Sequence, residues 1–160
     1  MRKQVTGHDA TAESPGNAQE NWLPLETLAT AEVSSEAAGY PVENALVPGA
    51  AGYWQAASTG AATITLRFDA PQSVRRVLLQ VEDAGHERSQ EWAITASFAD
   101  GTRRELLRQG WNFSPGGSTQ QVEEYTFDLH QVSGLTLWID PDRGRDRYPA
   151  VLSAWRVSGA

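Results

Sequence analysis

The chain has 160 residues, a length typical of one domain that buries roughly 70% of its unfolded surface. It has no cysteine, which excludes disulfides and thiolate metal sites, so any metal would need oxygen or histidine ligands. Its 20 acidic and 13 basic residues give a formal net charge of -7, which disfavours nucleic acid and anionic membranes as partners.

The N-terminal region differs in composition from the rest of the chain. Residues 1–21 are polar and lack apolar periodicity, which is typical of a disordered tail. They contain no apolar stretch that could serve as a secretory signal or span a membrane, so a cytoplasmic location is the expectation. We therefore expect the folded domain to cover residues 22–160.

Short stretches after the tail alternate between apolar and polar residues with a period of two. Five such stripes each predict a strand with one buried face. They are Ile64, Leu66 and Phe68; Val77, Leu79 and Val81; Trp92, Ile94, Ala96 and Phe98; Tyr125, Phe127 and Leu129; and Leu135, Leu137 and Ile139. Only residues 41–47 favour a short helical turn, and Asp100-Gly101 predicts a tight hairpin. About eight strands without βαβ spacing predict an antiparallel β-sandwich or jelly roll.

The order of short motifs along the chain resembles a known family. EVSSE, ENAL, YWQA, ATITLRFDAPQSVRRVLLQ, ASFADGTRREL and AVLSAWRVSG follow one another as in discoidin, or coagulation-factor type C, domains, which have a galactose-binding-like fold. Family 32 carbohydrate-binding modules and some intracellular scaffold domains share this pattern. The resemblance covers residues 32–159, and it implies the fold and a ligand site in the loops at one end.

Two positions depart from the calcium-binding members of that family. Those members hold the ion with an Asp after the Asn-Ala pair and a Glu in the last strand. In this chain the places that correspond by resemblance are occupied by Val47 and Ala154. Neither side chain offers an oxygen to a cation that prefers six to eight such ligands. The disulfide and the apolar membrane-inserting spikes of some members are missing too. We expect a domain that needs no metal or other cofactor and binds no membrane.

Three loops combine polar groups with aromatic or charged residues. In the first, residues 82–92, His86, Arg88 and Glu91 are candidate hydrogen-bonding residues for sugar hydroxyls. The more ordinary interpretation, slightly favoured, is a solvated charged loop. In the third, residues 140–149, the charges are expected to pair with one another, which leaves Tyr148 as the candidate contact residue. Its interleaved arginines argue against a calcium loop.

The second loop, predicted for residues 106–117, places Trp111 and Phe113 around Asn112 before a Ser-Pro-Gly-Gly segment. Sugar-binding family members often use a His, an Arg and an Asn with one aromatic residue. The resembling set here consists of His86, Arg108, Asn112 and Trp111. Trp111 would either stack on a sugar or cap the end of the core, and the sequence leaves both open. The binding site is predicted where the loops of His86 and Trp111 meet.

The remaining tryptophans are assigned to strands. Trp54 and Trp92 are expected in the core, and Trp155 is expected to share a buried face with Val151 and Val157. Trp138 points away from its apolar stripe, which would suit a protein partner.

The motifs favour binding over catalysis. The sequence contains no nucleophile elbow, HExxH motif, P-loop or dinucleotide fingerprint, so no catalytic residue is predicted. Two partner classes remain, a galactose-like glycan and a protein bound by an intracellular scaffold domain. Glycan binding is placed narrowly first because of the polar loop residues, and the sequence does not set the oligomeric state.

Overall fold

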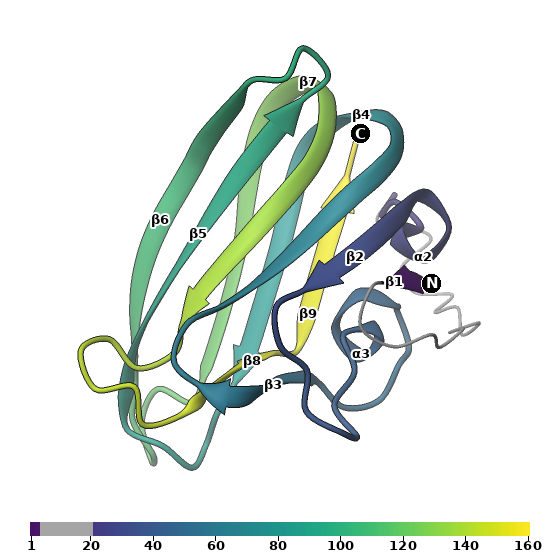
Figure 1. The fold of residues 1–160 in the computed structure, drawn as a ribbon. Helices are drawn as coiled ribbons and strands as arrows, with labels where there is room; N and C mark the ends of the chain where they lie inside the picture. The colour runs from purple at the N-terminus through teal and green to yellow at the C-terminus, as the bar shows by residue number, and fades with distance from the viewer. Residues whose placement is uncertain (4–20) are drawn as a thin grey trace.

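The computed structural model, described here for residues 1–3 and 21–160, consists mostly of β-strands arranged in two layers (Figure 1). The elements are β1 (Arg2–Lys3), α2 (Leu25–Leu28), β2 (Ala29–Val33), α3 (Glu43–Leu46), β3 (Trp54–Thr59), β4 (Ala62–Glu82), β5 (Arg88–Phe98), β6 (Arg103–Phe113), β7 (Gln120–Asp140), β8 (Pro149–Leu152) and β9 (Ala154–Ser158). Apart from β1, which runs parallel to β2, the paired strands are antiparallel. The predicted antiparallel sandwich is therefore confirmed.

The two long strands β4 and β7 connect the layers. The first part of β4 pairs with β2 and with the last part of β7, whereas its last part pairs with β9 and the first part of β7. Register shifts between Arg67 and Arg76 mark the bend, as expected because bulges bend a strand. The sheet order is β1-β2-β4-β7-β5-β6 with β9 beside β4, so one sheet folds over to enclose the core.

The core lies between the layers and contains the predicted apolar stripes. Trp54, Trp92 and Trp155 are fully buried, and the stripes in β4 and in the last part of β7 are buried as expected. Phe98, Tyr125 and Phe127 of the predicted stripes are only half-buried, although all three pack against the core. Val151 does not share the buried face of Trp155, since β8 ends at Leu152 and the break at Ser153 shifts the alternation.

The predicted hairpin joins β5 to β6. Gly101 has a φ of 88°, which an L side chain rarely adopts, and Asp100 Oδ1 accepts the Thr102 N–H at 2.9 Å. The predicted helical turn is α3. Both local predictions are confirmed because they depend on residues that are neighbours in sequence.

The N-terminal boundary differs from the prediction. Arg2 and Lys3 pair in parallel with Thr30 and Ala31 of β2, because the outer edge of β2 offers free backbone hydrogen-bonding groups. Residues 1–3 therefore belong to the sheet, and the rest of the predicted tail, residues 4–20, lies outside the described residues. No helix in the described ranges has the length and apolar character needed to cross a membrane.

The loops that matter for function lie at one end of the sandwich. The connections after β4 (residues 83–87), after β6 (114–119) and after β7 (141–148) gather at the lower end of the view in Figure 1. The β5–β6 hairpin lies at the opposite end. This arrangement brings together residues that are far apart in the sequence.

Candidate functional site

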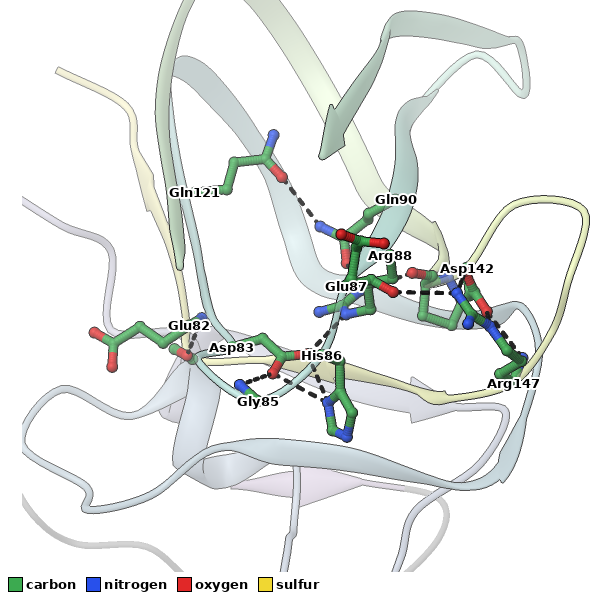
Figure 2. Close-up of polar contacts among 12 residues, drawn as sticks. Glu82, Asp83, Gly85, His86, Glu87, Arg88, Gln90, Gln121, Asp142 and Arg147 are labelled. Carbon is green, nitrogen blue, oxygen red and sulfur yellow. Dashed lines mark hydrogen bonds and ion pairs between the residues drawn. The ribbon is translucent and has the colours of Figure 1, made fainter. Parts of the chain in front are cut away.

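Asp83 fixes the loop between β4 and β5. Its Oδ1 accepts the backbone N–H of Gly85 at 3.0 Å, and its Oδ2 accepts Arg88 Nε at 2.8 Å. His86 Nδ1 lies 3.0 Å from the same Oδ2 (Figure 2). Burial opposes ionisation of Asp83, but the hydrogen bonds from Arg88, Gly85 and His86 outweigh it and hold the pKa of Asp83 below its usual value. The loop is therefore built around an ionised carboxylate.

Arg88 lies beneath this loop and is not a surface residue. Only 1% of its side chain is exposed, because the alternation of β5 turns it toward the interior. Its Nη1 donates to Gln90 Oε1 at 3.0 Å and to the Pro141 carbonyl at 2.7 Å, and its guanidinium lies over the Phe113 ring. Gln90 in turn donates to Gln121 of the other layer at 3.0 Å (Figure 2). The predicted role of Arg88 as an exposed donor is corrected to an internal tie between loops and layers.

His86 and Tyr148 meet across two loops. Their ring centroids are 4.2 Å apart with the planes tilted by 37°, although the residues lie on different connections. Both line a pocket of about 250 Å³, here named the His86–Tyr148 pocket. Its other walls include Tyr53, Gln55, Glu82, Asp83 and Ala84. Two of the predicted site residues are thus brought together.

Tyr53 and Gln55 were not singled out from the sequence. Tyr53 stacks on Tyr40 with the centroids 5.0 Å apart, and both rings are partly exposed. The sequence did contain a signal that both side chains face outward. Tyr53 and Gln55 flank the buried Trp54, and strand alternation turns both neighbours of a buried residue outward.

Trp111 lies in strand β6 and not in a loop. It pairs with Gln90 of β5, and its half-buried ring packs against the hydrophobic core beside the wholly buried Phe113. The two rings share the inner face, as their spacing predicted, but the strand continues to Phe113 because Gly110 and Asn112 still pair with β5. The two predicted segments do meet, because Gln90 pairs with Trp111 in the β5–β6 ladder. Trp111 nevertheless lines neither the His86–Tyr148 pocket nor the arginine pocket defined below, so the structure does not bring it together with His86 in one pocket.

Arg108 and Asn112 lie on the outer face of β6, opposite to Trp111. Arg108 contacts Glu105 at 2.7 Å and Glu91 at 3.3 Å, and its guanidinium covers the half-buried Trp138 ring at 5.0 Å. Arg108 and Glu91 therefore belong to a network on the outer sheet face and not to the His86–Tyr148 pocket. The sequence prediction grouped Arg108 and Asn112 with Trp111 because it treated residues 106–117 as a loop. In a strand, odd and even residues face opposite sides, which separates them.

The loop after β7 carries a second pocket next to the first. Asp142 is buried and receives Arg147 Nε at 2.8 Å and Nη2 at 3.2 Å, an interaction that lowers the pKa of Asp142. The prediction that the charges of this loop pair with one another holds for Asp142 and Arg147. It does not hold for Arg143, which faces Glu91 of β5. A pocket of about 340 Å³, here named the arginine pocket, is lined by Glu87, Arg88, Ser89, Asn112, Phe113, Ser114, Asp142, Arg143, Arg145 and Arg147.

The place of the family's calcium ion does not fit a metal in this chain. Arg156 Nη1 donates to the carbonyls of Ala45, in the Asn-Ala pair, at 2.7 Å and of Trp155 at 3.1 Å. Burial of this guanidinium lowers the pKa of Arg156. Val47 is buried, and Val47 and Ala154 offer only apolar side chains where the family has its carboxylates. The described residues contain no cluster of three or more His, Asp or Glu arranged to hold an ion.

We expect Arg156→Met to lower the free energy of unfolding by about 1–3 kcal/mol, because two carbonyls would lose a charged donor. Chelator and excess calcium should leave the melting temperature of the wild type unchanged, since an ion present at 100 times its dissociation constant would contribute about 2.7 kcal/mol and shift it by several degrees. Differential scanning calorimetry measures both. A calcium-dependent rise in the wild type would contradict the assignment of this place to Arg156.

Comparison with known proteins supports the architecture. No family model and no curated protein matches the chain in sequence. Its structure is similar to the family 32 carbohydrate-binding module of NanJ from C. perfringens, solved with galactose, at a TM-score of 0.63 and 15% identity, covering 86% of this chain and 97% of that one. A pectin-binding carbohydrate-binding module gives 0.60 and 17%, covering 84% and 92%.

A third similar structure is the family 32 module of AlyQ in complex with 4,5-unsaturated mannuronic acid, at a TM-score of 0.56 and 16% identity, covering 83% of this chain and 96% of that one. Identities this low establish the fold and nothing finer. The chain therefore has the galactose-binding-like, discoidin-type β-sandwich fold, as its motif order predicted.

Proposed function

We propose that this chain is a non-catalytic glycan-binding module whose sugar site is the His86–Tyr148 pocket. The observation that carries the proposal is the convergence of three separate segments on this pocket. Tyr53 and Gln55 come from the β3 region, His86 from the β4–β5 loop and Tyr148 from the β7–β8 loop. A pyranose has hydroxyls on its rim and C–H groups on its faces, so it needs aromatic surface bordered by donors and acceptors, which this pocket provides.

The polar groups of the pocket are suited to sugar hydroxyls. Gln55 offers an amide donor and acceptor. His86 uses Nδ1 to contact Asp83 and offers its other ring nitrogen, Nε2, to a ligand. The imidazole is thereby held in one orientation by the partly buried Asp83 carboxylate. A pre-oriented polar group loses less entropy when a ligand binds than a free one does.

The carboxylates beside the pocket favour binding over hydrolysis. Asp83 is held ionised by its hydrogen bonds, so it has no proton to donate near neutral pH. Glu82 accepts hydrogen bonds from Gln80 at 2.8 Å and from Gln120 at 3.3 Å. Both carboxylates thus act as structural acceptors.

The similar solved structures support a glycan as the ligand class. Their names record galactose, pectin and an unsaturated mannuronic acid as ligands of those proteins. We extend the class, and not any one of these sugars, to this chain. The protein-binding alternative remains that of an intracellular scaffold domain with this fold, but the surface singled out for it, Trp138, is covered by the Arg108 guanidinium at 5.0 Å.

The test is a glycan array followed by titration calorimetry with the best-binding glycan. Tyr148→Ala should weaken that glycan about ten-fold or more, and His86→Ala about five-fold, the loss expected for one hydrogen bond of about 1 kcal/mol. His130→Ala is the matched control, because His130 is also exposed and also contacts an aspartate, Asp128, at 3.1 Å, but lies outside the pocket.

Melting temperatures of the variants should stay close to that of the wild type. An array on which the wild type binds no glycan would overturn the proposal and favour a protein partner. Equal losses in His86→Ala and His130→Ala would show that the effect is not specific to the pocket.

A further inference from the structure

The arginine pocket has a charge opposite to that of the whole chain. Arg143, Arg145 and Arg147 are exposed on the loop after β7, and Arg88 forms part of the wall. Against these four cations the lining contains two carboxylates, those of Glu87 and Asp142. The formal net charge of the chain is nevertheless -7, so the lining of this pocket is a local exception.

The internal ion pairs leave part of this positive charge available. Arg147 binds the buried Asp142 through Nε and Nη2, which leaves its Nη1 without an acceptor among the described residues. Arg143 Nη1 lies 3.5 Å from Glu91, a distance too long for a strong hydrogen bond. Arg145 has no ion-pair partner within 4.0 Å in the described part of the chain. Glu87 is the only carboxylate of the lining that is exposed.

The arginine pocket and the His86–Tyr148 pocket are contiguous. Each of the two loops supplies consecutive residues to both, His86 and Glu87 from one and Arg147 and Tyr148 from the other. Arg147 joins the loops, because its Nη2 donates to the Glu87 carbonyl at 3.1 Å and its guanidinium lies 5.1 Å from the Tyr148 ring centroid. Figure 2 shows Arg147 reaching from Asp142 toward the loop of Glu87. The two pockets therefore lie beside each other along the same two loops.

We propose that the arginine pocket is an acidic subsite, so that the ligand of this module is an anionic oligosaccharide with a carboxylate or sulfate on the sugar next to the one held by His86 and Tyr148. The inference rests on the proposed glycan-binding function and deepens it. Guanidinium groups bind carboxylate and sulfate oxygens through paired, charge-assisted hydrogen bonds. Because the chain as a whole carries a formal net charge of -7, the clustered arginines are what would attract such a ligand to this pocket.

The experiment compares three oligosaccharides of equal length by titration calorimetry. They are an oligogalacturonate, its fully methyl-esterified form, which is neutral, and a sulfated galacto-oligosaccharide. The wild type should bind at least one of the two acidic probes about ten-fold or more tightly than the neutral ester, since each charge-assisted hydrogen bond contributes about ten-fold or more. The ratio between the oligogalacturonate and the sulfated probe distinguishes a carboxylate from a sulfate. Added salt should weaken the acidic probes and leave the ester unaffected.

The double variant Arg143→Gln/Arg145→Gln should lose this preference and keep its affinity for the ester. Both side chains are exposed, so its melting temperature should not change. The matched control is Arg103→Gln/Arg104→Gln, which removes two exposed arginines next to the β5–β6 hairpin at the opposite end. This control should keep the wild-type preference for the acidic probes, because its substitutions lie away from the arginine pocket. A loss of preference shared by both double variants would reflect the change in net charge alone.

The outcomes separate the two proposals. If the ester binds as tightly as both acidic probes, or if the Arg143/Arg145 variant retains its preference, the acidic subsite is wrong and glycan binding stands. If no oligosaccharide binds to the wild type in these titrations and the glycan array is also negative, both are wrong. Binding of an acidic polypeptide such as polyglutamate as tightly as the oligogalacturonate would also overturn the assignment of the pocket to a sugar ligand.

Discussion

Replacing Arg88 with leucine is expected to lower the free energy of unfolding by about 3–5 kcal/mol at neutral pH, the cost of removing one partner from a buried ion pair. Leucine would leave the Asp83 carboxylate, of which 12% is exposed, without its guanidinium partner. It would also leave the Pro141 carbonyl and Gln90 Oε1 without their donor. Urea unfolding followed by tryptophan fluorescence measures the difference.

The pH dependence identifies the cause. The pKa of Asp83 is depressed in the folded protein, so its ionised form contributes stability that is present above the unfolded pKa and is lost as the pH falls through the folded pKa. The difference between wild type and Arg88→Leu should therefore narrow below about pH 4, the pKa of an unperturbed aspartate. A difference that stays constant down to pH 3 would show that Arg88 acts through packing on Phe113 and not through charge.

The matched control is Arg145→Leu, the same substitution at the same end of the sandwich. Arg145 is exposed, so the change in unfolding free energy should stay within about 0.5 kcal/mol. A comparable loss in both variants would mean that removal of any positive charge from this end is destabilising.

Trp111→Ala is expected to destabilise the protein by about 3 kcal/mol, the lower end of the range for a buried tryptophan, because its ring is half-buried against the core. The folded fraction should bind glycan as the wild type does, since Trp111 lines neither pocket. Chemical denaturation combined with calorimetry at a temperature where the variant is folded separates the two readouts.

Asn112→Ala provides the comparison for Trp111→Ala. Asn112 is the next residue of β6, but it is exposed and accepts one hydrogen bond, from Ser89 at 2.8 Å. Its removal should cost about 1 kcal/mol or less. A Trp111→Ala protein with unchanged stability and lost glycan binding would place the tryptophan in the ligand site after all.

The amino-acid sequence by itself determined the strands and the fold. The alternation at Ile64, Leu66 and Phe68 and the Asp100-Gly101 turn depend only on neighbours in the chain, and both appear as predicted. A period of two leaves one arrangement in which the apolar residues are buried, which is why such patterns specify strands well. The order of the motifs then specified the discoidin-type sandwich.

The tertiary structure decided which residues share a site. His86 and Tyr148 were both candidates, but only the folding of β4 and β7 through both layers brings their loops into contact. Trp111, placed in a loop from its sequence, lies in β6 because pairing with β5 continues to Phe113. Pairing between strands distant in sequence has no signal in a single stretch of residues.

The same reason explains the role of the arginines. In sequence Arg88 resembles the other loop arginines, yet the alternation of β5 buries it against Asp83, while Arg143 and Arg145 remain exposed at the pocket. Whether a charged residue is buried or free depends on which carboxylate the fold brings within reach. The sequence thus supplied the chemical groups of this end of the sandwich, and long-range packing determined which of them hold the loops and which remain available to a ligand.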